Sequence, residues 1–184
     1  SRMRSCFTLA WLALAPFALG QSELAHMMVE PDIHGDQVVF CSEGDVWLGD
    51  LKTQTAVRLT TWPGNETRPR FSPDGKSVLF SGQYDGRRDA YVVPVTGGEP
   101  IRWTWDKSGA EPLEWAPDGR SIYIRSGRGH AFRSDRIFQV FAPGQMPTLI
   151  PIQRAGNLAI DGKANLIYTK FAERSNNWRP YRGA

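Results

Sequence analysis

The sequence is poor in the residues that form covalent cross-links and metal sites. It has two cysteines and three histidines in 184 residues, and Cys6 lies in an apolar segment near the amino terminus. Loss of that segment would leave Cys41 alone, which excludes an intramolecular disulfide, so hydrophobic burial must hold the fold. The sequence contains no Cys-x-x-Cys or His-Glu-x-x-His motif. We therefore expect no metal site and no cofactor.

An excess of one charge is also missing. The 22 lysines and arginines nearly balance the 19 aspartates and glutamates, for a formal net charge of +3, and 41% of the residues are hydrophobic. This composition is typical of a globular protein and excludes a highly charged disordered chain. It also provides no basic field, so we expect no nucleic-acid partner.

Long apolar runs are absent except for residues 7–19. Two arginines precede this run, and the small-residue pattern Ala18-Leu19-Gly20 ends it. The pattern predicts a secretory signal peptide over residues 1–20, because a membrane span needs about 20 apolar residues. The mature chain would begin near Gln21 in the periplasm or outside the cell, with no other membrane association. An uncleaved membrane anchor is the alternative.

A turn followed by an apolar, β-rich run recurs along the chain. Its glycines are spaced by 40, 44 and 43 residues, and a fixed period of this size is typical of stacked supersecondary units. An Asp-Gly pair tolerates the positive φ of a tight hairpin, so each copy should join two antiparallel strands. The predicted structural turns contain Gly35, Asp74, Gly75, Asp118, Gly119, Asp161 and Gly162.

Further strand-like runs lie between the turns. Residues 45–51, 89–95 and 136–141 are each followed by a shorter run, at 56–60, 100–104 and 147–152. Helical periodicity is absent after the signal segment, and four-stranded sheets at this period are the blades of a β-propeller with PD40/WD40-like repeats. We predict an all-β fold in which residues 21–184 form a partial β-propeller of antiparallel blades. The repeats lie near 27–62, 68–105, 112–152 and 157–184.

The predicted blades do not complete a ring. Three blades and the start of a fourth are present, whereas a closed propeller typically has 4 to 8 blades. We therefore expect the chain to be an amino-terminal piece of a longer protein. A small protein that closes by self-association is the alternative.

Three phrases resemble those of one protease family. They are Pro-Asp-Ile-His-Gly-Asp at 31–36, Asp-Val-Trp at 45–47 and Asn-Trp-Arg-Pro-Tyr-Arg-Gly at 177–183. Their order and spacing resemble the amino-terminal propeller of tricorn-type proteases, although Ala184 stands where the family usually has a second glycine. The resemblance implies a six-bladed parent ring, followed by a second propeller, a PDZ-like domain and a serine peptidase that trims peptides. The nucleophile and its histidine belong to that last domain, so no catalytic residue is assigned to this chain.

The phrase at residues 177–183 has no repeat partner. Non-repeating loops of a propeller gather at the ends of its channel and carry binding. We hypothesise that Trp178, Tyr181 and Arg182 line the mouth of the channel and admit or orient peptide. A buried plug between blades is an equal alternative.

An arginine-rich loop at residues 125–136 is a weaker candidate. Guanidinium groups bind carboxylates in a bidentate fork, so this loop could bind a peptide carboxylate. We favour a solvated loop in which Asp135 pairs with an arginine. Arg87 and Arg88, in a turn after Asp85-Gly86, receive no binding role.

Taken together, these patterns favour the propeller portion of a tricorn-like serine peptidase. It would act as a scaffold and gate for peptide substrates, with proteolysis carried out by downstream domains that this sequence lacks. Peptides and those domains are the expected partners, and the parent hydrolase is a candidate homo-oligomer. The alternative is a stand-alone, TolB-like periplasmic interaction propeller. A prolyl-oligopeptidase relative is disfavoured by the phrase at 177–183.

Overall fold

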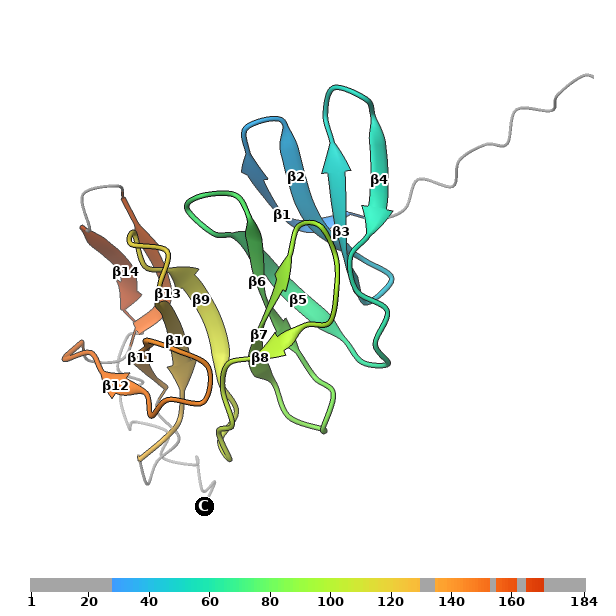
Figure 1. Cartoon of the computed structure of the whole chain (residues 1–184). Helices are drawn as coiled ribbons and strands as arrows, with labels where there is room; N and C mark the ends of the chain where they lie inside the picture. Colours follow the sequence, from blue (N-terminus) through green and yellow to red (C-terminus); the bar gives the residue numbers. More distant parts are fainter. Residues whose placement is uncertain (1–27, 130–134, 153–154, 162–164, 171–184) are drawn as a thin grey trace, which may run out of the picture.

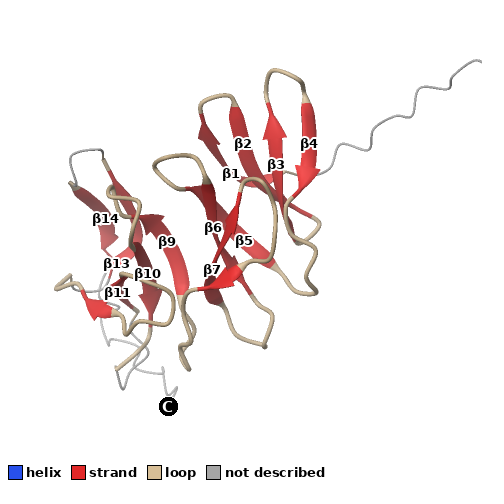
Figure 2. Cartoon of the chain, in the orientation of Figure 1, coloured by secondary structure: helices blue, strands red, loops and turns tan. Residues whose placement is uncertain are grey.

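The computed structural model describes residues 28–129, 135–152, 155–161 and 165–170 (Figure 1). Within these ranges the chain consists of strands and loops without a helix (Figure 2), and thus without a helical segment able to cross a membrane. Valine, isoleucine and aromatic residues dominate the strands, because their branched or flat side chains pack well on a pleated surface.

The strands form four separate antiparallel sheets in chain order. Sheet one contains β1 (Val29–His34), β2 (Gln37–Ser42), β3 (Asp45–Asp50) and β4 (Thr55–Arg58). Sheet two contains β5 (Glu66–Phe71), β6 (Ser77–Gly82), β7 (Asp89–Pro94) and β8 (Ile101–Arg102). Sheet three contains β9 (Glu111–Trp115), β10 (Ile122–Ser126), β11 (Arg136–Val140) and β12 (Thr148–Leu149). The fourth sheet pairs β13 (Ala155–Ile160) with β14 (Leu166–Lys170).

The repeated turns join the first and second strands of the sheets. Gly35, Gly75 and Gly119 have φ values of +59°, +69° and +65°. In the second sheet the Asp74 carboxylate accepts hydrogen bonds from the Ser72 hydroxyl at 2.6 Å and the Lys76 amide at 3.1 Å. Asp118 accepts one from the Arg120 amide at 2.9 Å. Each aspartate thus closes its own turn, and the glycine supplies the left-handed backbone.

Successive sheets pack face against face in an arc (Figure 1). β5 contacts β1, β2 and β3 of the preceding sheet, and β9 contacts β5, β6 and β7 in the same way. The first strands β1, β5, β9 and β13 therefore follow one another along one side of the arc, while β4, β8 and β12 occupy the opposite edges of their sheets. Radially arranged four-stranded sheets of this kind define a β-propeller, of which three blades and two strands of a fourth are seen.

The hydrophobic core lies between the blades. The seam between blades one and two buries Val39, Cys41, Val46, Leu59, Phe71, Val78, Phe80, Tyr91 and Val93. The seam between blades two and three buries Leu79, Ala90, Val92, Trp103, Ala110, Trp115, Ile122, Ile124, Phe138 and Val140. β6 contributes to both, because Phe80 faces one seam and Leu79 the other. A middle strand covered on both faces becomes a continuous apolar run, so Val78-Leu79-Phe80 does not alternate with polar residues.

Candidate functional site

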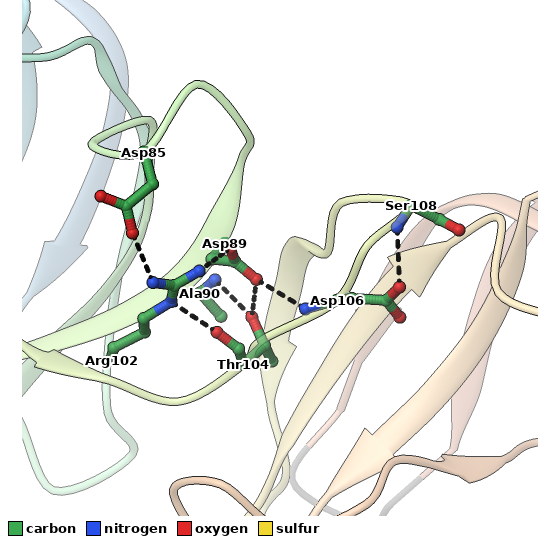
Figure 3. Close-up of polar contacts among 7 residues, drawn as sticks. All are labelled: Asp85, Asp89, Ala90, Arg102, Thr104, Asp106 and Ser108. Carbon is green, nitrogen blue, oxygen red and sulfur yellow. Dashed lines mark hydrogen bonds and ion pairs between the residues drawn. The ribbon is translucent and has the colours of Figure 1, made fainter.

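A buried polar triad closes the second blade at the start of β7 (Figure 3). Arg102 pairs with the Asp89 carboxylate at 2.7 Å, and the Thr104 hydroxyl donates to the same carboxylate at 2.7 Å. The Ala90 amide donates to the Thr104 hydroxyl at 2.9 Å. The Asp89 side chain is 2% exposed. A charge buried this deeply is stable only because an arginine and further donors satisfy it.

The same triad occurs in the first blade. Arg58 pairs with Asp45 at 2.8 Å, and the Val46 amide donates to the Thr60 hydroxyl at 2.9 Å. There the Thr60 hydroxyl donates across the seam to Glu66 of the second blade, which also accepts from the Tyr84 hydroxyl of its own blade. The triad therefore links neighbouring blades.

The third blade lacks the triad. The Ile150 amide bonds to the Ile137 carbonyl, as the Trp103 amide bonds to that of Ala90, and this backbone bond aligns the two blades. The alignment places Arg136, Leu149 and Pro151 at the triad positions. The sequence signal that reveals the triad is Asp in the third strand followed by Arg-x-Thr in the fourth, at equal spacing in the first two blades.

Around the second triad, two loops are held together. Arg102 also pairs with Asp85 at 2.6 Å, in the loop between β6 and β7. The Asp106 amide donates to Asp89 at 3.3 Å, and the Asp106 carboxylate accepts from the Ser108 amide at 2.9 Å and the Ser126 hydroxyl at 3.0 Å. This network therefore fixes the loop of residues 83–88 and the loop of residues 105–110 relative to one another (Figure 3), and the Ser126 hydroxyl joins the end of β10 to them.

These loops surround a pocket of about 650 Å³, which we call the loop pocket. Its lining consists of Gln83, Gly86, Arg87, Arg88, Lys107, Ser108, Gly109, Gly127 and Asp135. The Ala110 amide bonds to the Arg88 carbonyl at 2.8 Å, and a Cβ on Gly109 would lie 3.5 Å from that oxygen. The two cationic loops are thus in direct contact.

Positive charge dominates the loop pocket. Arg87, Arg88 and Lys107 are exposed, and none of them forms an ion pair with another residue that the structure describes. Among the lining residues that the structure describes, the single carboxylate is that of Asp135, which lies 3.6 Å from the guanidinium of Arg125. The pocket is therefore chemically suited to bind an anionic group.

Charged residues also connect the first strands of the four sheets. The Arg68 guanidinium pairs with Glu111 at 2.7 Å and donates to Asn157 at 3.4 Å, and the Arg68 amide donates to Glu30 at 2.6 Å. Glu111 pairs in addition with Arg125. Arg68 has a φ of +57° at a β-bulge, which aims its side chain toward the next two blades.

Only some of the residues singled out from the sequence lie in the part of the chain that the structure describes. Trp178, Tyr181, Arg182 and Gly162 lie outside the described residues, as do residues 130–134 of the arginine-rich loop. Arg125 of that loop is held by Glu111 and Asp135. Asp161 accepts hydrogen bonds from Asn165. The sequence assigned no binding role to Arg87, Arg88 or Lys107, because nothing in it shows that loops from two strand connections meet.

Groups for catalysis or metal binding do not gather in the described part of the chain. Residues 28–129, 135–152, 155–161 and 165–170 contain no cluster of three His, Cys, Asp or Glu side chains able to hold a metal ion. Burial raises the pKa of the Cys41 thiol to about 12, which suppresses its thiolate.

Comparison with known proteins identifies the family. The profile of the Tricorn protease N-terminal beta propeller domain matches residues 25–184, so the chain belongs to that family. It is 29% identical over 154 residues to Tricorn protease homolog 1 of Streptomyces coelicolor and 28% identical over 156 residues to the Tricorn protease homolog of Saccharolobus solfataricus. Each match covers 83% of this chain and 14% of the relative, so the chain spans about one seventh of their length.

Solved structures share the fold. A crystal structure of the tricorn protease matches with a TM-score of 0.68 and 22% identity, over 78% of this chain and 15% of that one. TolB from Acinetobacter baumannii matches with a TM-score of 0.70 and 22% identity, over 82% of this chain and 39% of that one. At this level of identity the structural matches show the propeller fold alone.

Proposed function

We propose that this propeller arc is the amino-terminal scaffold and gate of an exported, tricorn-like serine peptidase. Membership of the tricorn amino-terminal propeller family supports this proposal most strongly. Because the chain covers 14% of its tricorn relatives, proteolysis belongs in this proposal to domains beyond this sequence. Export follows from the signal-like residues 1–20.

The gate has two parts in this proposal. Loops at one end of the blades form the loop pocket, where a peptide can be held. The hypothesis that Trp178, Tyr181 and Arg182 line the channel mouth adds a second contact. In the parent enzyme, Arg182→Ala should slow peptide turnover and leave the melting temperature unchanged. A lower melting temperature with normal turnover would instead indicate a structural plug.

A stand-alone interaction propeller is the second candidate function. The fold match to TolB favours it, because TolB is matched as closely as the tricorn protease. The two candidates differ in what must accompany the arc. A peptidase gate requires a serine hydrolase site in the same chain or complex, whereas an interaction module requires none.

An immunoblot of the source organism separates these candidates. An antibody against residues 36–100 should detect a species several times larger than the 184-residue chain, in the exported fraction, that reacts with a fluorophosphonate probe for serine hydrolases. A species of the size of this chain, with no probe-reactive protein in its immunoprecipitate, would contradict the proposal and favour the interaction module.

A further inference from the structure

The loop pocket has an excess of cationic side chains that form no ion pair with any other described residue. Arg87, Arg88 and Lys107 line it together, while Asp135, the one acidic residue among the described lining, is engaged by Arg125. Surface arginines usually gain from a nearby carboxylate, and leaving three cations together is electrostatically unfavourable unless an anion joins them. We propose that the loop pocket binds the acidic side chains of peptides and selects peptides that contain them.

Neighbouring acidic groups do not neutralise the pocket. Asp85 and Asp89 are both paired with Arg102. Asp106 belongs to the same loop as Lys107 and is 8% exposed, and its carboxylate accepts from the Ser108 amide (Figure 3) and also from the Ser126 hydroxyl. These three carboxylates anchor the loops around the pocket and are not among its described lining residues.

The same network gives the pocket a fixed shape. Arg102 holds the loop of residues 83–88 through Asp85, and Asp89 holds the loop of residues 105–110 through the Asp106 amide. Loops anchored in this way lose little conformational entropy when a ligand binds. Three glycines of the lining, Gly86, Gly109 and Gly127, leave the backbone open to a ligand.

Acidic peptides fit this chemistry better than neutral ones. Arg87 and Arg88 each provide a planar fork for a carboxylate, and Lys107 adds a point charge at the facing loop. A pocket of about 650 Å³ has room for two or three residues of an extended peptide. Since the ligand is a peptide, this inference rests on the proposed function.

The test compares three peptides on the complete 184-residue chain by isothermal titration calorimetry. The first, acetyl-Ala-Glu-Leu-Glu-Ala-Leu-amide, has carboxylates only on its side chains. The second replaces both glutamates by glutamine and is uncharged. The third is the glutamine peptide with a free carboxyl terminus, which supplies a carboxylate from the other source. The acidic peptide should bind at least about tenfold more tightly than the uncharged one, and added salt should weaken its binding.

Matched variants locate the binding. The double variant Arg87→Gln/Arg88→Gln should reduce binding of the acidic peptide about tenfold or more, and Lys107→Gln should reduce it less. The control Lys76→Gln/Arg120→Gln removes the same charge from the turns at the opposite end of the blades and should bind as the parent chain does. All these side chains are exposed, so circular dichroism should be the same for every variant.

Each other outcome has a defined meaning. Equal binding of the acidic and uncharged peptides overturns the inference but leaves the peptide gate intact. Absence of binding by all three peptides counts against the proposed function itself. A free-terminus peptide that binds as tightly as the acidic peptide, or equal losses in the pocket and control variants, would overturn the assignment of acidic side chains to this pocket.

Discussion

The buried ion pair of the second blade allows a sharp test of what stabilises the arc. Arg102 contacts two carboxylates: Asp89, which is 2% exposed, and Asp85, which is 68% exposed. Replacing Asp89 by asparagine removes the buried charge and leaves the guanidinium with its exposed partner. Breaking a buried pair costs about 3–5 kcal/mol, and the remaining contact with Asp85 should lower this to about 2–3 kcal/mol of unfolding free energy.

The matched control is Asp85→Asn, the same chemical change on the same arginine. An exposed pair is worth about 0–1 kcal/mol, so this variant should unfold almost as the parent chain does. Urea unfolding followed by tryptophan fluorescence measures both, because Trp103 and Trp115 pack edge to face, with ring centroids 5.8 Å apart, in the adjacent seam. Equal losses for the two variants would refute the argument that burial decides the strength of this ion pair.

Three further predictions concern single groups. Burial raises the pKa of Glu66 above its usual 4.5, against opposing hydrogen bonds from Thr60 and Tyr84. The unfolding free energy of the parent chain relative to Glu66→Gln should therefore be greatest below pH 4.5 and fall as the pH rises through the higher pKa of the folded state. Urea unfolding at several pH values measures this difference, and a difference that grows with pH would contradict the prediction. In a Cys6→Ser background, Cys41 should resist a thiol reagent at about pH 8 until urea unfolds the chain, and rapid reaction of the folded chain would show that its thiol is accessible. Gly75→Ala should lower the melting temperature more than Gly35→Ala. Both glycines have positive φ, but a Cβ on Gly75 would also clash with the His34 ring, whereas one on Gly35 meets no atom within 4 Å. Equal losses of melting temperature would exclude that clash.

The blade architecture was predictable because its signals are local. An Asp-Gly turn and an apolar run specify a hairpin through neighbouring residues, and the period of the glycines specifies that hairpins stack. Trp47, Tyr91 and Phe138 recur at one position of the repeat; Tyr91 and Phe138 are buried in seams between blades, whereas Trp47 is half-buried. Trp105 shows the limit of such reasoning: it lies beside the same strands, yet it is 59% exposed and lies over Arg102.

The candidate site was not predictable in the same way. Arg87 and Lys107 are far apart in the sequence and belong to different connections between strands. They line the same pocket because Asp85, Asp89 and Asp106 tie the two loops to one buried network. The recurrence of Asp and Arg-x-Thr could have been found in the sequence as a second repeat. That the aspartate pairs with this arginine and threonine is seen only once the strands are paired.

The sequence by itself determined the all-β class, the period of the blades and the family. These depend on turn chemistry and hydrophobic pattern, which act over a few residues and repeat along the chain. The tertiary structure alone decided which charges are buried and paired, as with Asp89 and Arg102, and which remain open to a ligand, as with Arg87, Arg88 and Lys107. The physical reason is that charge compensation depends on distances between side chains from different strands and loops, and packing of the blades sets those distances.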